Sequence, residues 1–226
     1  MPNYCMNKLE LVGDQKEVAQ LLKWVKGPDN AFDFQRIIPM PESIKDTERG
    51  SISFASEAVC LYLQDKTVSN HLQWLMERNQ IAMEKLDATI EKWEKEKKID
   101  LAMGYRIIAN RLAYNGCGDW YEWCIENWGT KWEACETEVV DNVINFETAW
   151  SPCTPIVEKL AELFPEIQFI YTYFEPGVSL AGIEKYQNGD CVELQVYEQE
   201  EKEYRYIGEG FGYEFENDNE ENNKVN

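Results

Sequence analysis

Apolar and polar residues alternate over residues 4–12, and this period of two predicts a β-strand at the start of the chain. Asp14 and Glu17 then form a capping-box pattern, which opens a segment whose apolar residues recur at helical spacing as far as Val25. Residues 31–41 alternate again and end in two prolines, which is typical of a strand that runs into a turn. The chain is therefore expected to begin as β-α-β.

Residues 55–115 are nearly free of Gly and Pro and rich in Glu, Lys, Gln, Met and Ala, a composition that predicts helices. Two sets of positions repeat there every seven residues: Leu72, Asn79, Leu86 and Trp93, and between them Met76, Met83 and Ile90. This stripe fits an intramolecular antiparallel pair with a helix over residues 100–115, or a coiled-coil dimer with Asn79 at a core position. The adjacent second helix favours the intramolecular pair.

Strand patterns return over residues 136–140 and 143–150. Thr154, followed by a proline, suits the N-cap of a helix. The alternating segment 167–174 predicts another strand, and Asn188 with the glycine after it predicts the turn of a further hairpin. The second half of the chain is thus expected to be β-α-β with an added hairpin.

Two split βαβ halves of this kind form a ferredoxin-like plait, an α+β fold with its helices on one face of the sheet. We therefore expect such a plait with an inserted helical hairpin and an added C-terminal β-hairpin. The expected boundaries are 1–54 and 117–198 for the ferredoxin-like domain, 55–116 for the helical insertion, 199–216 for terminal strands and 217–226 for a disordered acidic tail.

The formal charge of −20 is concentrated in two segments. Residues 119–148 carry eight acids and one base, and residues 198–226 carry ten acids and three bases. A negative field of this size repels phosphate, so it disfavours direct binding of nucleic acids or anionic membranes. The same field attracts a basic protein surface, although it also serves solubility.

These two segments supply the candidate site residues. The acidic candidates for binding a basic partner are Glu122, Glu126, Glu133, Glu136, Glu138, Glu200, Glu201, Glu203 and Glu209. Five tryptophans accompany them: Trp120, Trp123, Trp128, Trp132 and Trp150. A capping box formed by Asp119 and Glu122 predicts a short helix here, followed by a turn and a strand. We expect the tryptophans mainly to pack at this junction, and the acids around them to meet a partner.

Catalytic and metal-binding patterns are lacking in the sequence. His71 is the only histidine, and it lies in the helical segment with no nucleophile motif nearby. The seven cysteines form no CxxC pair, which excludes the common zinc motifs and indicates reduced, buried thiols. Carboxylates near tryptophans are also found in glycosidases, but the expected plait offers no deep cleft. We therefore expect no enzyme activity, no metal and no cofactor.

Several segments resemble the YubB ferredoxin-like domain family, whose members come from phages, conjugative plasmids and integrated elements. The resemblance rests on the start MPNYCMNKLELVG, on FDFQRIIPMPESI, on ENWGTKW and on FETAWSP, where Cys153 takes the place of a second proline. It covers both halves of the plait and omits the helical insertion and the tail. It implies a ferredoxin-like fold and a mobile-element origin, and it implies no catalytic residue.

The sequence therefore predicts a non-catalytic accessory protein of a phage or other mobile element. We expect it to bind and inhibit a basic, nucleic-acid-handling host protein, such as a defence nuclease, with its acidic surface in place of nucleic acid. One alternative is a small-ligand or nucleotide-binding module that uses Tyr171 and Tyr173 of the sheet. Another is an oligomeric structural component assembled through the Leu72–Trp93 stripe. With no signal-peptide pattern and no membrane-spanning run, a cytoplasmic location is expected.

Overall fold

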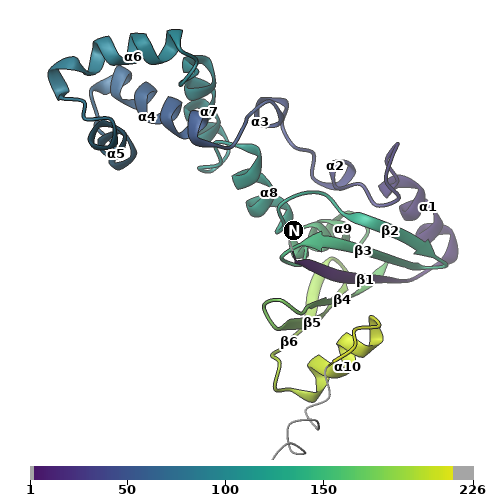
Figure 1. Ribbon diagram of the computed structural model, residues 1–226. Coiled ribbons are helices and arrows are strands. Elements are labelled where there is room, and N and C mark those ends of the chain that lie inside the picture. Colours follow the sequence, from purple (N-terminus) through teal and green to yellow (C-terminus); the bar gives the residue numbers. More distant parts are fainter. Residues whose placement is uncertain (1–2, 216–226) are drawn as a thin grey trace, which may run out of the picture. The chain divides into compact units, whose positions relative to one another are not determined.

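The computed structural model describes residues 3–215, which group into two compact units (Figure 1). The first, here called the sheet unit, holds residues 3–39 and 127–215, and the second, the helical unit, is Met40–Glu126. The insertion is thus longer than the expected 55–116 at both ends. The predicted acidic tail at 217–226 lies outside the described residues.

The sheet unit has the expected ferredoxin-like α+β topology. Its strands are β1 (Tyr4–Val12), β2 (Cys135–Val140), β3 (Val143–Ala149), β4 (Gln168–Glu175), β5 (Leu180–Gln187) and β6 (Asp190–Tyr197). Neighbouring strands are antiparallel, in the order β2-β3-β1-β4-β5-β6. Helices α1 (Gln15–Val25) and α9 (Thr154–Leu163) connect β1 toward β2 and β3 to β4. The β5–β6 hairpin extends the plait beyond β4, as predicted.

The prediction of a strand at residues 31–41 is wrong, because this segment forms the short helix α2 (Phe34–Ile37). The Asp33 carboxylate caps that helix by accepting the Gln35 N–H at 2.8 Å. Phe32, Asp33 and Phe34 are all buried, with the two ring centroids 5.4 Å apart, so burial does not alternate here as it does in a half-buried strand. Strand β2 takes the second position of the plait instead, which places the insertion inside the first βαβ half rather than between the halves.

The two faces of the sheet are covered by different helices. On one face, here called the α9 face, Cys5, Leu9 and Leu11 of β1 are buried, and α9 packs against β4, β5 and β6. Helix α1 meets the end of α9 where the Trp24 and Phe164 rings lie 5.4 Å apart. The opposite face, here called the α10 face, carries the alternate residues of each strand.

Helix α10 (Lys202–Gly210) lies on that opposite face, and it corrects the prediction of terminal strands at 199–216. Its Tyr204 and Ile207 are three residues apart on one side of the helix and are buried against Phe174 of β4 and Ala181 of β5. The aromatic and glycine residues here therefore serve a helix–sheet contact rather than a strand. Figure 1 shows α10 on the side of the sheet away from α9.

The helical unit contains several short helices rather than one hairpin. They are α3 (Glu42–Lys45), α4 (Ser51–Asp65), α5 (Asn70–Arg78), the 3-10 helix η1 (Met83–Lys85), α6 (Leu86–Lys95), α7 (Leu101–Ala113) and most of α8 (Trp120–Trp128). Helix α7 packs on α4, where a Cβ at Gly104 would lie only 2.5 Å from the Ser56 carbonyl oxygen. The predicted pairing of residues 100–115 with the seven-residue stripe is therefore wrong.

The stripe itself forms part of the core of this unit. Leu72, Leu86 and Trp93 are buried in one cluster with residues of α4. Asn79 is exposed and caps the end of α5, so it is not a coiled-coil core position. Leu72, Leu86, Ile90 and Trp93 are thus packed within the unit, whereas Met83 of the same stripe is 48% exposed. No helix within residues 3–215 is long and apolar enough to cross a membrane.

Candidate functional site

The acidic candidates of the helical unit differ in their surroundings. Glu122 faces inward and accepts hydrogen bonds from the Arg111 guanidinium at 2.8 and 3.1 Å and from the Gly118 N–H at 2.8 Å. Partial burial acts to raise the pKa of Glu122, but the Gly118 N–H and Arg111 outweigh it, and the pKa is lowered. Glu126, on the same helix, is exposed.

Arg111 and Arg49 together hold the start of α8 to the rest of the helical unit. Arg111 also binds Glu57 of α4 at 2.6 and 3.2 Å. Arg49 binds the Asp119 carboxylate at 2.7 Å and stacks over the Tyr121 ring at 4.5 Å. The Glu122 carboxylate is thus bound within the helical unit. Of the two acidic candidates on α8, Glu122 and Glu126, only Glu126 is exposed.

The remaining acidic candidates lie in the sheet unit. Glu136 and Glu138 are exposed on β2, and Glu133 is half-buried just before it. Glu138 lies opposite Asn145, and Glu147 lies opposite Met6, so both acids are on the α10 face. Partial burial and the neighbouring Glu136 raise the pKa of Glu147.

Helix α10 carries or precedes the other four candidates. Glu200 and Glu201 are exposed in the turn before it, and the Glu201 carboxylate accepts the Glu198 N–H at 2.7 Å. Glu203 is half-buried in the first turn of the helix, and Glu209 is exposed near its end. The β2 and α10 acids are thus far apart in sequence but belong to the same side of one sheet.

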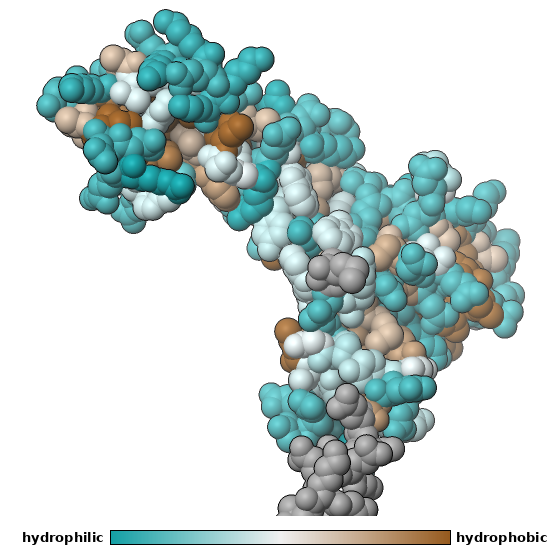
Figure 2. Space-filling model, in the orientation of Figure 1, coloured by the Kyte–Doolittle hydropathy of each residue, from teal (hydrophilic) through white to brown (hydrophobic). Residues whose placement is uncertain are grey.

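The division into units also separates the charge. The described residues of the sheet unit hold 23 acidic and ten basic side chains, a formal charge of −13, whereas the helical unit holds 15 acidic and 11 basic side chains, or −4. Figure 2 shows hydrophilic residues over most of the visible surface of the sheet unit. The negative field therefore belongs mainly to the sheet unit.

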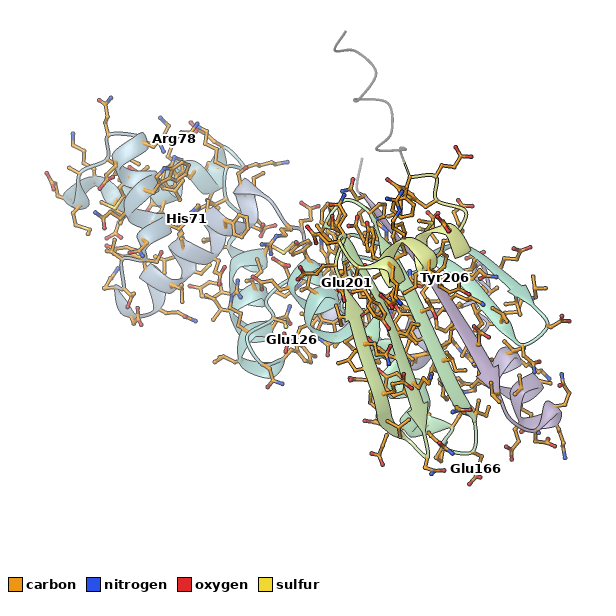
Figure 3. All side chains as sticks on the ribbon, turned by 90° about the horizontal axis from the view of Figure 1, so that it is seen from below. His71, Arg78, Glu126, Glu166, Glu201 and Tyr206 are labelled. Atoms are coloured by element: carbon orange, nitrogen blue, oxygen red, sulfur yellow. The ribbon has the colours of Figure 1, made fainter. Side chains whose placement is uncertain are left out.

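A cavity of ≈ 400 Å³ opens between α10 and the strands of the α10 face. Lys8, Glu10 and Thr172 line it from the sheet, and Tyr206, Glu209 and Phe211 line it from the helix and its C-terminus. Lys8 binds Glu10 at 2.9 Å, whereas Glu209, the other carboxylate of the cavity, has no salt bridge within residues 3–215. Tyr206 is 79% exposed at the cavity rim. Figure 3 shows α10 in front of the strands, with Tyr206 labelled on it.

The tryptophans divide into packed and partly exposed residues. Trp123 and Trp128 are buried, and the Trp128 indole N–H donates to the Ile38 carbonyl oxygen at 2.9 Å. Trp120 and Trp132 are half-buried, and Trp150 is 41% exposed. In the sheet unit the Lys131 ammonium lies 4.9 Å from the Trp132 ring and 4.6 Å from the Trp150 ring. The packing expectation therefore holds for Trp123 and Trp128 and fails for Trp150.

A buried polar network, which the sequence pattern did not reveal, lies under α9. The Tyr171 hydroxyl donates to the Asn7 side-chain oxygen at 2.6 Å and accepts the Cys153 N–H at 2.9 Å. Beside it, the 3% exposed Glu184 carboxylate accepts the hydroxyls of Thr154 at 2.8 Å and Tyr186 at 2.6 Å. Only the spacing of polar residues inside strongly apolar strands could have indicated it.

This network also corrects the expected role of Tyr171 and Tyr173. Both rings point into the α9 face, where they are 0% and 4% exposed, so they offer no surface for a ligand. Burial raises the pKa of the Cys153 thiol to about 12, which keeps it protonated and unreactive. The network is thus suited to structural packing.

His71 lies in the helical unit, and the cysteines of the described residues are free thiols. The His71 ring stacks on Trp74 at 5.5 Å on the helical unit. Among residues 3–215, no group of three or more His, Cys, Asp and Glu side chains is placed to hold a metal ion. Cys191 is the exposed cysteine of this part of the chain, and it lies on β6.

Part of the chain matches a known family of protein domains. Residues 127–223 match a family model described as a ferredoxin-like domain in Api92-like protein. Among solved structures, the crystal structure of protein api92 from Yersinia pseudotuberculosis is similar with a TM-score of 0.44 and 14% identity, over 87% of this chain and 98% of that one. No curated protein matches the chain. Over residues 127–223 the chain is therefore similar to the ferredoxin-like domain of Api92-like proteins.

Proposed function

We propose that the chain is a non-catalytic accessory protein that binds a basic, nucleic-acid-handling protein through the α10 face of its sheet unit. The observation that carries this proposal is the charge of −13 on the described residues of that unit. Opposite charge raises the rate of encounter with a basic surface and disfavours acidic competitors.

The cavity beside α10 gives this acidic face a place for one basic side chain of the partner. The Glu209 carboxylate and the rings of Tyr206 and Phe211 line the same hollow, in which Glu10 is already paired with Lys8. A guanidinium binds carboxylates through paired hydrogen bonds and stacks on aromatic rings, so an arginine suits this lining better than a lysine. Such an anchor would concentrate binding energy at a few residues.

The biological setting of the proposal comes from the segments that resemble the YubB family. We infer a mobile-element origin, a cytoplasmic location in the host cell, and inhibition of a host or defence protein whose basic groove normally holds nucleic acid. In this mechanism the acidic face occupies the groove and excludes the phosphate backbone.

Binding to a panel of purified basic nucleic-acid-binding proteins tests the proposal, with duplex DNA as competitor. We expect a complex that weakens as NaCl rises and that duplex DNA displaces. The double variant Glu138→Gln/Glu209→Gln removes two charges from the α10 face and should weaken binding by about tenfold. The control Glu162→Gln/Glu166→Gln removes two charges at and after α9 and should bind as the wild type does.

Two outcomes would contradict the proposal. One is that no basic protein of the panel binds at low salt. The other is that both double variants weaken binding equally, because the effect would then reflect net charge rather than the α10 face.

The cavity also favours a second candidate function, binding of a small ligand. Its volume of ≈ 400 Å³ lies in the usual range for small-molecule sites. A thermal-shift screen of metabolites separates this function from the first, since a ligand of the native state raises the melting temperature without a protein partner. Loss of such a shift in Tyr206→Ala would locate the ligand in this cavity.

A further inference from the structure

Strand β6 forms one edge of the six-stranded sheet. Its backbone pairs with β5, and no other backbone hydrogen bond joins residues 191–197 to the described part of the chain. The N–H and C=O groups on the outer side of such a strand are available to another strand.

An apolar row runs along this edge. Val192, Leu194 and Val196 are 58%, 61% and 51% exposed. Leu194 lies opposite Glu184 and Val196 lies opposite Gly182, so both are on the α9 face, at the margin that α9 leaves uncovered. Alternating exposed aliphatic residues on a free edge are the pattern of a strand that pairs with another chain.

The other edge of the same sheet differs. Strand β2 has six residues against eight in β6, and it carries the exposed acids Glu136 and Glu138. Both edge strands have a register irregularity, on β2 between Cys135 and Glu138 and on β6 at Val192, and β6 pairs regularly with β5 from Glu193 to Tyr197. Short length and charges of the kind found on β2 prevent pairing at an edge. From Val192 to Tyr197, β6 has neither lysine nor proline, and its single acid, Glu193, is bound to Lys185 at 2.6 Å.

We infer that β6 pairs antiparallel with β6 of a second copy of this chain, about a two-fold axis at Leu194. In this register Leu194 faces itself and Glu193 faces the neutral Gln195, both within the regular stretch of β6, and Val196 meets the irregularity at Val192 of the other copy. A centre at Glu193 would instead set two carboxylates against each other, which is unfavourable. A centre at Gln195 would set Val192 against Glu198. The self-complementary order of aliphatic residues therefore selects one register.

Charge sets how this pairing responds to salt. With the axis at Leu194, the end of β6 with Asp190 in one copy lies near Glu198 of the other, and each sheet unit carries −13 in its described residues. Salt screens this repulsion and leaves the apolar contact, so self-association should strengthen as NaCl rises. Binding of a basic partner should weaken under the same change, which makes the two interactions separable.

Cysteine cross-linking tests the register in the full chain. Opposed residues of antiparallel strands have Cα atoms about 4.5–5.5 Å apart, a separation that a disulfide bridges. In a Cys191→Ser background, we expect Leu194→Cys to form a disulfide dimer on mild oxidation. Glu193→Cys alone should not do so, whereas a mixture of Glu193→Cys and Gln195→Cys chains should form a mixed dimer. Failure of Leu194→Cys to cross-link, or efficient cross-linking of Glu193→Cys alone, would overturn the inference.

Sedimentation equilibrium tests the association without cross-links. The wild type should show a monomer–dimer equilibrium that shifts toward dimer in NaCl. Leu194→Lys sets two ammonium groups against each other at the axis and should weaken dimerisation by about tenfold or more. Leu112→Lys, at a position 85% exposed in the helical unit, makes the same chemical change and should leave dimerisation unchanged. A monomeric wild type at its highest soluble concentration in high salt, or equal effects of the two variants, would exclude the dimer.

Discussion

At the scale of single residues, Glu184 is a carboxylate inside the core of the sheet unit. Burial raises its pKa, although the hydroxyls of Tyr186 and Thr154 donate to it and act in the opposite direction; the nearby Glu158 raises it further. The folded protein therefore holds the Glu184 proton more tightly than the unfolded chain does. The stability linked to this proton is fully present below the unfolded pKa and is lost as pH rises through the folded pKa.

Replacement of Glu184 by Gln should remove this pH dependence. Gln keeps the shape and can still accept a hydroxyl, but it does not ionise. We expect the free energy of unfolding of E184Q to increase relative to that of wild type as pH rises from 4 to 8, because only the wild type loses stability over this range, and urea titration measures both values. Glu162→Gln, on the exposed surface of α9, is the control and should follow the wild-type profile. A constant difference between E184Q and wild type over this range would contradict the prediction.

Arg111 joins two carboxylates of the helical unit, because its guanidinium binds both Glu57 and Glu122. Arg111→Ala leaves two partly buried carboxylates without their shared cation and should destabilise the protein by about 1–3 kcal/mol. Arg106→Ala on the same helix loses an exposed contact with Asp46, at 3.6 Å to its carboxylate and 3.4 Å to its carbonyl oxygen, and should cost about 0.5 kcal/mol or less. Chemical denaturation measures the loss of unfolding free energy in each variant. Similar losses in the two variants would contradict a stabilising role for the Arg111 ion pairs.

At the scale of elements, α10 depends on close contact with the sheet at one glycine. A Cβ at Gly208 would lie 2.6 Å from Phe215 Cζ and 2.8 Å from Phe174 Cζ, whereas a Cβ at Gly210 meets nothing within 4 Å. Both glycines belong to the same helix. Space, rather than helix propensity, therefore distinguishes the two positions.

These two glycines provide a matched pair of variants. Gly208→Ala should force the rings apart and destabilise the packing of α10 by about 1–3 kcal/mol. Gly210→Ala should stabilise the helix by about 0.4–1 kcal/mol, because alanine restricts the unfolded chain and favours the helix. Urea unfolding and the rate of proteolysis within α10 report both effects. If the two substitutions acted in the same direction, the close contact at Gly208 would be refuted.

At the scale of the whole molecule, charge is distributed unequally between the two units. The sheet unit carries −13 in its described residues and the helical unit −4. Excess charge of one sign destabilises a folded unit by self-repulsion, and salt screens it. Stability against heat should therefore depend on salt chiefly through the sheet unit.

Calorimetry in increasing NaCl tests this expectation. The melting temperature of the sheet unit should rise by about 2–4 °C between low salt and physiological salt, which corresponds to about 1 kcal/mol for a protein of this size. The transition of the helical unit should move less. A melting temperature that stays constant or falls for the sheet unit would contradict this account of its charge.

Local patterns in the sequence were sufficient for the elements whose periodicity agrees with their packing. The alternation of residues 4–12, the capped helix α1 and the Asn188 turn predicted β1, α1 and the β5–β6 hairpin, and their order indicated the plait. The prediction failed at residues 31–41 and 199–216, where aromatic residues looked alternating but pack from short helices. Periodicity over a few residues does not distinguish these cases, because burial by distant residues overrides local preference.

The amino-acid sequence by itself determined the ferredoxin-like α+β class, the presence of a helical insertion and the strongly acidic charge. Only the tertiary structure decided which acids face solvent, since Glu122 is bound by Arg111 while Glu138 and Glu209 are exposed. It also decided that Tyr171 and Tyr173 are buried and that β6 is an open apolar edge. The reason is physical: composition and period are properties of the chain, whereas exposure and pairing depend on contacts between segments far apart in it.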